Sequence, residues 1–137
     1  MTAGEIETLL RKRIMEAAPP ITGKVYFKDM RPRQNDNDLH LEDCEVAVLT
    51  GTGSEQIEGT CTVNVWVPDT LTSSGIYMKS KRRTDAIEAW MTTLPPIIRD
   101  GRIYFQRDGI IATLKEQDTN EHFVSLKMRF KVLVNNY

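Results

Sequence analysis

The stretch VSLKMRFKV, residues 124–132, alternates apolar and polar side chains without a break. Its apolar positions, with the next alternate one, are Val124, Leu126, Met128, Phe130, Val132 and Val134. Successive side chains of a β-strand point to opposite faces, so this period of two predicts a strand over residues 123–134 with one buried and one solvated face. Sheets with one wet face are typically antiparallel. We therefore expect an antiparallel sheet that is covered on one side.

Two amphipathic helices can supply that cover. Thr2-Ala3-Gly4-Glu5 has the form of a capping box, in which the Thr hydroxyl and the Glu carboxylate bind the first free N–H groups of a helix. Apolar residues then recur at helical spacing until two prolines stop the pattern, and a second such pattern ends in the same way. The apolar faces comprise Ile6, Leu9, Leu10, Ile14 and Ala17 in the first helix and Ile87, Trp90, Met91 and Leu94 in the second. We expect Trp90 to lie in the core.

The other strands complete the sheet. Strand-like patterns occur at residues 24–28, 44–50, 57–67, 102–106 and 110–115. Asp108-Gly109 is a strong signal for a two-residue hairpin between the last two of these, and residues 117–120 form the next turn. The 137 residues are thus predicted to form a single α+β domain, 1–137, with one mainly antiparallel β-sheet and two α-helices packed on one face.

The segment VLTGTGSEQ, residues 48–56, looks at first like the start of a phosphate-binding loop. A loop of the Walker type needs Lys followed by Ser or Thr, and then a helix whose free N–H groups face the phosphate. No Lys follows Gly51 or Gly53, and the next residues have the period of a strand. We interpret the segment as the link of a β-hairpin and predict no nucleotide-dependent activity.

No catalytic or ligand-binding constellation can be recognised. Cys44 and Cys61 fall on apolar strand faces, where cysteine commonly packs as a small hydrophobe, although a disulfide or a Cys–His pair remains open. His40 and His122 lack the spacing of metal ligands, and the acids of the polar loop at residues 30–43 depart from the calcium-loop pattern. We expect no enzymatic activity, no cofactor and no metal.

The charge of the chain favours neither a nucleic-acid nor a membrane partner. There are 18 basic and 19 acidic side chains, and the formal net charge is -1. The basic run KSKRR at residues 79–83 can contact phosphates, but no aromatic residues are interleaved with it, and a solvated helix end is the simpler interpretation. No apolar segment approaches the length of a membrane span, and residues 1–7 lack the pattern of a signal peptide.

The order of the pieces carries a resemblance. They are the opening helix at residues 5–17, VYFKDMRP at 25–32, EVAVLTG at 45–51, a strand ending in VWVPD at 65–69, and DAIEAWM at 85–91. In this order, over roughly residues 5–130, the chain resembles the tail terminator, or tail completion, proteins of long-tailed bacteriophages, the family of the minor tail protein U of phage lambda. It departs from the family in the closing strands from Arg102 onward.

The resemblance implies a structural virion or prophage component without enzymatic activity, assembled in the host cytoplasm and located in the virion tail. Members of the family form a ring, commonly of six subunits, on the end of the tail tube. The ring halts polymerisation of the tail-tube protein and presents a surface to the head connector. A head-closure or neck adaptor is a related alternative, and a small ligand-binding or enzymatic domain is a more distant one.

A ring also suggests where an oligomer interface lies, because it needs head-to-tail contacts whose rotation closes. The hypothesised interface residues are Thr52, Gly53, Ser54 and Glu55 in the hairpin link, Asp36 and Asp38 in the acidic loop, and Lys127, Arg129 and Lys131 in a basic stripe. The stripe either meets the acids of a neighbour or is simply the wet face of the sheet. Trp66 shares a strand face with polar residues, so it is either covered by a helix or presented to a partner.

Overall fold

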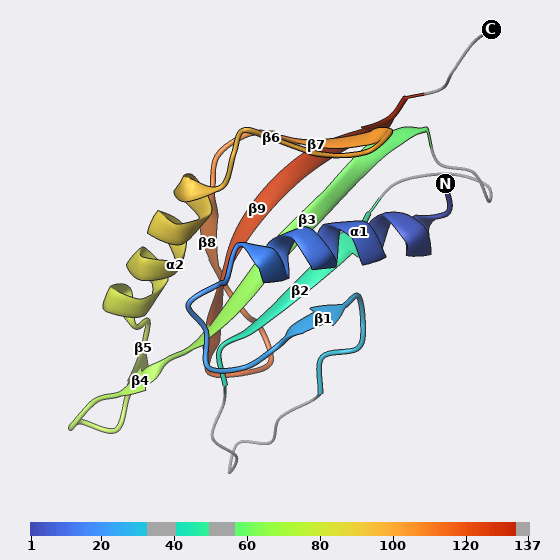
Figure 1. Cartoon of the computed structure of the whole chain (residues 1–137). Coiled ribbons are helices and arrows are strands. Elements are labelled where there is room, and N and C mark those ends of the chain that lie inside the picture. Colours follow the sequence, from blue (N-terminus) through green and yellow to red (C-terminus); the bar gives the residue numbers. More distant parts are fainter. Residues whose placement is uncertain (33–40, 50–56, 134–137) are drawn as a thin grey trace, which may run out of the picture.

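The computed structural model describes residues 1–32, 41–49 and 57–133. In this part of the chain, a seven-stranded sheet carries helices α1 (Ala3–Glu16) and α2 (Lys81–Thr93) on one face (Figure 1). The α+β fold with a mainly antiparallel sheet is therefore confirmed. No helix among these residues is both long and apolar enough to cross a membrane.

The sheet is built around its longest strand. Its order is β1-β2-β3-β9-β7-β6, and β8 also pairs with β9. The strands are β1 (Val25–Phe27), β2 (Asp43–Val48), β3 (Glu58–Pro68), β6 (Ile97–Asp100), β7 (Ile103–Arg107), β8 (Ala112–Lys115) and β9 (Glu121–Val132). The β1–β2 pair is parallel, and the other pairs are antiparallel. Because β3 pairs with β9 along its whole length, these two strands form the spine of the fold.

The core lies between the sheet and the two helices. As the alternation predicts, Val124, Leu126, Met128, Phe130 and Val132 are buried, whereas Lys127, Arg129 and Lys131 are exposed. The helices contribute Ile6, Leu10 and Ile14 from α1 and Ile87 and Met91 from α2. Val134, also predicted to point inward, lies outside the described residues.

The first helix begins as its sequence predicts. The Thr2 hydroxyl accepts a hydrogen bond from the Glu5 N–H at 3.2 Å, and the Glu5 carboxylate accepts one from the Thr2 N–H at 3.4 Å. Both halves of the capping box are thus present. Two free N–H groups at the helix start are satisfied in this way, which fixes where α1 begins.

Trp90 lies at the margin of the core, and the expectation that it belongs inside the core was wrong. Its half-buried ring packs against the core cluster, while Nε1 donates a hydrogen bond to the Ala17 carbonyl oxygen at 3.0 Å. A buried indole N–H needs a polar partner, so the ring sits where such a partner is available. Trp90 therefore links α2 to Ala17, the residue that follows α1, at the margin of the core.

The Asp108-Gly109 hairpin was also predicted wrongly. β7 and β8 do not pair with each other but lie end to end along the same edge of β9. The Asp108 N–H donates to the Lys127 carbonyl oxygen at 2.9 Å, which continues the ladder past the end of β7. Gly109 then takes a φ of 87°, a conformation that suits glycine. Asp108-Gly109 therefore separates β7 from β8. Both strands pair with β9, because β9 is long enough to pair with one after the other.

Three short strands were not predicted from the sequence. β4 (Thr70–Leu71) and β5 (Tyr77–Met78) form a small separate hairpin. β6 follows the two prolines that stop α2 and pairs with β7. With two residues each, β4 and β5 contain too few positions to show a period in the sequence.

The two cysteines are free and buried, which confirms the interpretation as packed thiols. They are not cross-strand partners, because Cys61 lies opposite Val48. Burial raises the pKa of Cys61 to about 12. Burial also raises the pKa of Cys44, and the negative charges of Glu45 and Asp43 raise it further. Both thiols are protonated at neutral pH and are poorly suited to act as nucleophiles.

Candidate functional site

The face of the sheet turned away from the helices is the candidate functional surface, called here the open face. Alternation along each strand decides which side chains reach it. They include Thr60, Thr62, Asn64 and Trp66 of β3, Tyr104 and Gln106 of β7, and Ser125, Lys127, Arg129 and Lys131 of β9. Both helices of the described chain lie on the other side (Figure 1). The open face is therefore polar and uncovered by helices.

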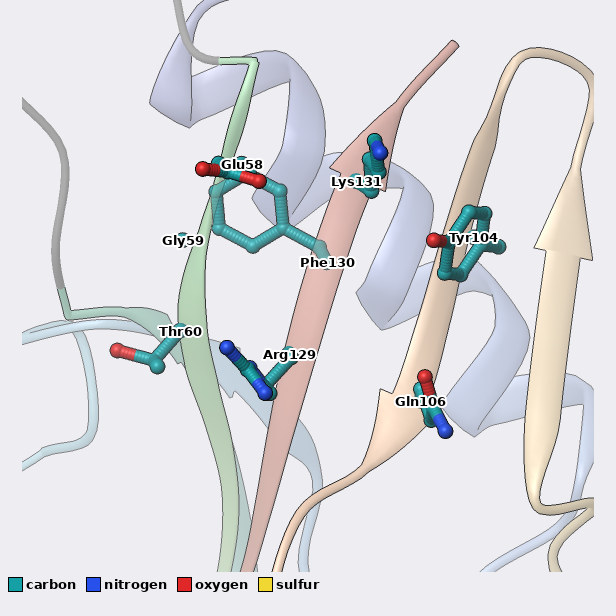
Figure 2. Close-up of a pocket in the computed structure, with 8 residues that line it drawn as sticks. All are labelled: Glu58, Gly59, Thr60, Tyr104, Gln106, Arg129, Phe130 and Lys131. Atoms are coloured by element: carbon teal, nitrogen blue, oxygen red, sulfur yellow. The ribbon is translucent and has the colours of Figure 1, made fainter.

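One end of the open face is hollowed. The hollow has a volume of about 480 Å³ and lies over the ends of β3, β7 and β9 (Figure 2). Its lining consists of Glu58, Gly59, Thr60, Tyr104, Gln106, Arg129, Phe130 and Lys131. Two cations face one carboxylate there, so its charge is net positive, and we call it the basic hollow. Tyr104 adds an aromatic wall.

Arg129 and Lys131 give the basic hollow its charge. Both side chains are exposed, and neither has an ion-pair partner among the described residues. Lys131 lies opposite Glu58 in the strand register, yet the described structure joins them by no ion pair. Lys127 differs, because its Nζ lies 3.8 Å from Oδ2 of Asp108. The predicted stripe thus divides into one paired lysine and two cations that have no ion-pair partner in the described part of the chain and that attract an anionic group.

The middle of the open face holds a polar atom without a partner. Asn64 lies between Glu45 of β2 and Ser125 of β9 in the register. Its Oδ1 is buried and accepts no hydrogen bond in the described structure. Leaving a buried polar atom unsatisfied costs about 1–3 kcal/mol.

Trp66, at the other end of the open face, is engaged within the chain. Its ring centroid lies 5.7 Å from that of Phe123, and the Arg31 guanidinium lies 4.8 Å above the ring. Its Nε1 donates a hydrogen bond to a Glu116 carboxylate oxygen at 2.9 Å. Trp66 is therefore covered, but by an arginine and not by a helix. Because its N–H and one ring face are already used, it is a poor anchor for a partner.

Arg31 is the centre of a cluster that sequence reasoning missed. Its Nε lies 3.2 Å from Oδ2 of Asp43, and another guanidinium nitrogen lies 2.5 Å from Oε2 of Glu121. Both carboxylate side chains are 1% exposed. The Thr119 hydroxyl also donates to Glu121, at 2.7 Å. No local signal marks this cluster, because Arg31 stands in a polar loop and Glu121 follows 90 residues later.

Six of the hypothesised interface residues lie outside the described residues. They are Thr52, Gly53, Ser54 and Glu55 of the hairpin link and Asp36 and Asp38 of the acidic loop. Their contacts with a neighbour therefore stay predictions. The strands that the link joins, β2 and β3, are antiparallel neighbours, as expected for a hairpin.

The described residues contain no group of three or more His, Cys, Asp or Glu side chains placed to hold a metal ion. The side chains of His122 and Asp69 form a polar contact, with 2.7 Å between Nδ1 and Oδ1. Lys115 Nζ approaches the other Asp69 oxygen at 3.6 Å. The Asp69 side chain is nearly buried, so this cluster ties the end of β3 to the β8–β9 hairpin.

Comparison with known proteins supports the fold and leaves the function open. No protein-family model matches the chain. No curated protein matches it. Five chains of solved structures match, and one of them, whose name says nothing about function, superimposes with a TM-score of 0.51 at 13% sequence identity. The match covers 96% of this chain and 93% of the other. At this identity the likeness shows that the two chains share a fold.

Proposed function

We propose that the chain is a structural subunit of a long-tailed bacteriophage or prophage, a tail terminator. In this proposal, copies assemble in the host cytoplasm into a ring of six on the end of the tail tube. The ring stops polymerisation of the tail-tube protein and presents a surface to the head connector. Support comes from the order of the elements along the sequence and from an α+β fold that agrees with that order.

The observation that carries the proposal is the one-sided sheet. Helices cover one face, while the open face keeps Arg129 and Lys131 without ion-pair partners among the described residues. Exposed cations without partners among the described residues favour contact with an acidic protein surface. A subunit held between a tail tube, its neighbours and a connector requires such surfaces.

Chemistry at the cysteines offers no better alternative. Nucleophilic catalysis by cysteine requires a thiolate, and burial keeps both thiols protonated at neutral pH. The His122–Asp69 pair is used in holding β3 to the β8–β9 hairpin. We therefore propose a role in assembly and not in catalysis.

The test is to add the purified chain to growing tail tubes of the phage or prophage that encodes it and to image the products by electron microscopy. We expect rings on tube ends and shorter tubes as the chain is added. Binding to the head connector without any effect on tube length would instead support a neck adaptor. Failure to bind either structure would contradict the proposal.

A further inference from the structure

The β4–β5 hairpin, residues 70–78, presents apolar side chains to solvent. It follows β3, forms a separate two-stranded sheet and projects beyond the end of the seven-stranded sheet (Figure 1). Its large apolar residues are Leu71, Ile76, Tyr77 and Met78, which are 56%, 61%, 47% and 59% exposed. Several exposed apolar side chains on one short segment mark a site of interaction. We call this segment the apolar hairpin.

The apolar hairpin is held in shape before any partner binds. The Thr72 N–H donates to the Ile76 carbonyl oxygen at 2.8 Å, and the Gly75 N–H donates to the Thr72 carbonyl oxygen at 3.0 Å. The Thr72 hydroxyl accepts from the Ile76 N–H at 3.2 Å. Gly75 adopts a φ of 82°, which suits glycine in a tight turn. A preformed hairpin loses little conformational entropy on binding.

Both faces of the apolar hairpin carry apolar side chains. Leu71 lies opposite Tyr77 in the strand register, and residues that lie opposite each other share a face. Met78 follows Tyr77 in the strand and therefore points to the other face. The hydrogen bond between Thr72 and Ile76 continues the ladder, so Ile76 shares the face of Met78. A flat surface can cover only one of these faces, whereas a cleft can cover both.

The base of the apolar hairpin is positively charged. Residues 70–84 contain no Asp or Glu, and Lys79 and Arg82 are exposed without an ion-pair partner in the described part of the chain. The acids that flank this segment, Asp69 and Asp85, each lie within ion-pair distance of a lysine. A partner that covers the hairpin therefore meets an excess of positive charge at its base, which carboxylates would complement.

A lipid surface suits the apolar hairpin less well than a protein does. The outer edges of a two-stranded sheet leave backbone N–H and C=O groups that need polar partners, and such open edges do not enter the hydrocarbon of a bilayer. The turn that would enter first, residues 72–75, has the polar sequence Thr-Ser-Ser-Gly. A protein cleft can supply polar partners to strand edges as well as apolar walls.

A second copy of the chain offers no complementary charge at two sites that a hairpin could reach. The basic hollow of that copy contains Arg129 and Lys131, which repel the cations at the base of the apolar hairpin. A contact between two such hairpins would bring Lys79 and Arg82 of one copy toward the same residues of the other. These observations favour a different protein as the partner.

We propose that the apolar hairpin inserts into a cleft of a partner protein that has apolar walls and carboxylates at its rim. In this contact the side chains on both faces of the hairpin are buried, and Lys79 and Arg82 face the rim. The choice of the tail-tube protein as the partner rests on the proposed function. A ring that halts polymerisation has to stay bound at the tube end, and a few buried anchors contribute most of the free energy of such binding.

Substitutions on each face of the apolar hairpin test whether a cleft encloses it. One variant combines Leu71→Thr with Tyr77→Thr, and the other combines Ile76→Thr with Met78→Thr. Threonine is polar and suits a strand, so the hairpin should still form. We expect each variant to weaken the capping of purified tail tubes by about tenfold or more. The matched control, Ile110→Thr, changes a side chain that is 86% exposed elsewhere and should alter capping by less than about twofold.

Cross-linking identifies the protein that holds the apolar hairpin. A benzophenone is attached to a chain with Tyr77→Cys, and tubes capped with this chain are irradiated. We expect a product that joins the chain to the tail-tube protein. The native thiols do not take up the label, because they are buried and protonated. The same label at Thr92→Cys, an exposed position on α2, gives the background.

The salt dependence of capping tests the charges at the base of the apolar hairpin. Arg82→Glu should weaken capping by about tenfold at low salt and by less at high salt, since ions screen contacts between exposed charges. Lys12→Glu makes the same change in net charge on α1 and serves as the control. An effect of Arg82→Glu that does not depend on salt, or that Lys12→Glu reproduces, would contradict the carboxylates at the rim.

Vesicles that contain phosphatidylserine serve as a probe for the lipid alternative. We expect the chain not to bind them. Binding that is lost in either of the two face variants would show that the apolar hairpin enters lipid, and it would overturn the inference.

The remaining outcomes separate this inference from the proposed function. If the unmodified chain caps tubes and neither face variant weakens capping, the hairpin contact is wrong and the proposed function stands. A loss in only one of the two variants would show a flat contact, and a cross-link to a second copy would show a contact between subunits. Either result overturns the inference. An unmodified chain that does not cap tubes overturns both the inference and the proposed function.

Discussion

The guanidinium group of Arg31 lies 4.8 Å from the centroid of the Trp66 ring and at the same time binds two carboxylates, of Asp43 and Glu121. One side chain thus joins an irregular segment to the ends of β2, β3 and β9. A planar guanidinium can do this because it offers several N–H donors in its plane and a flat face to an aromatic ring. The cluster closes the end of the open face opposite the basic hollow.

Replacing Arg31 should therefore lower the stability of the fold. Arg31→Ala leaves Asp43 and Glu121 buried without their cation, and we expect a loss of about 3–5 kcal/mol in the free energy of unfolding. Arg31→Lys should recover only part of this, because an ammonium group cannot serve both carboxylates and the ring. Urea unfolding measures the difference.

The matched control is Arg13→Ala. Arg13 also binds a carboxylate, that of Asp100 at 3.2 Å, but its side chain is 34% exposed. We expect this change to cost no more than about 1 kcal/mol. Equal losses for Arg31→Ala and Arg13→Ala would show that burial of the Arg31 cluster does not matter.

Two substitutions of Trp90 test the contact between α2 and the end of α1. Trp90→Phe keeps most of the apolar contact but removes the hydrogen bond to Ala17, and we expect it to cost about 1 kcal/mol. Trp90→Ala also removes the ring, and because the ring is only half-buried we expect about 3 kcal/mol, at the low end for such changes. If Trp90→Ala does not measurably change the midpoint of thermal unfolding, the ring does not stabilise the contact between α2 and the end of α1.

The sequence pattern predicted the structure correctly where the contacts that determine it lie within one helix or strand. The alternation in β9 identified its inward residues, and Thr2 with Glu5 fixed the start of α1. The pattern failed to predict strand pairing where the pairing partner is distant in the sequence. Asp108-Gly109 has the local preference of a hairpin, yet the strands beside it bind β9, and this choice depends on the length of β9 and not on the turn.

The candidate site shows the same division. The positions of Arg129 and Lys131 on the open face follow from alternation alone. That they have no ion-pair partner among the described residues, in contrast to Lys127, depends on where Asp108 falls in the tertiary structure. The exposure of Tyr77 and Met78 was equally hidden, because short apolar stretches are usually buried and only the packed fold shows that these are not.

The buried thiols predict a loss of stability at alkaline pH. A thiol in the unfolded chain ionises near pH 9.0, whereas Cys61 in the fold holds its proton to about pH 12 and burial also raises the pKa of Cys44. The folded state then binds more protons than the unfolded state, so this contribution is complete below pH 9 and is lost as pH rises toward 12. The slope is about 1.4 kcal/mol per pH unit for each thiol.

Urea unfolding between pH 8 and pH 11 measures this slope. In a chain with Cys44→Ala and Cys61→Ala, the free energy of unfolding should fall less steeply with pH, because the two thiols are absent. This holds whatever the stability of that chain at pH 8. Thiol reagents at pH 8 should react with the native chain only as fast as it unfolds. Rapid labelling of a folded chain would contradict the burial of the cysteines.

The last prediction concerns the basic hollow and rests on the proposed function. If Arg129 and Lys131 meet an acidic surface in the assembly, Arg129→Glu should weaken tube capping by about tenfold or more at low salt. At high salt the difference should shrink, because ions screen contacts between exposed charges. Lys127 is a less informative position than Arg129, since it already has Asp108 beside it. Imaging of capped and uncapped tubes at both salt concentrations gives the ratio.

The control for this prediction is Lys12→Glu, which changes the net charge of the chain by the same amount on the exposed surface of α1. A general effect of net charge on solubility or encounter would weaken capping equally in both variants. A local effect at the basic hollow weakens it only in Arg129→Glu and leaves thermal stability unchanged, because the Arg129 side chain is exposed. Equal effects of the two reversals, or no salt dependence of the Arg129→Glu effect, would remove the basic hollow from the interface and return Arg129 and Lys131 to the role of a solvated strand face.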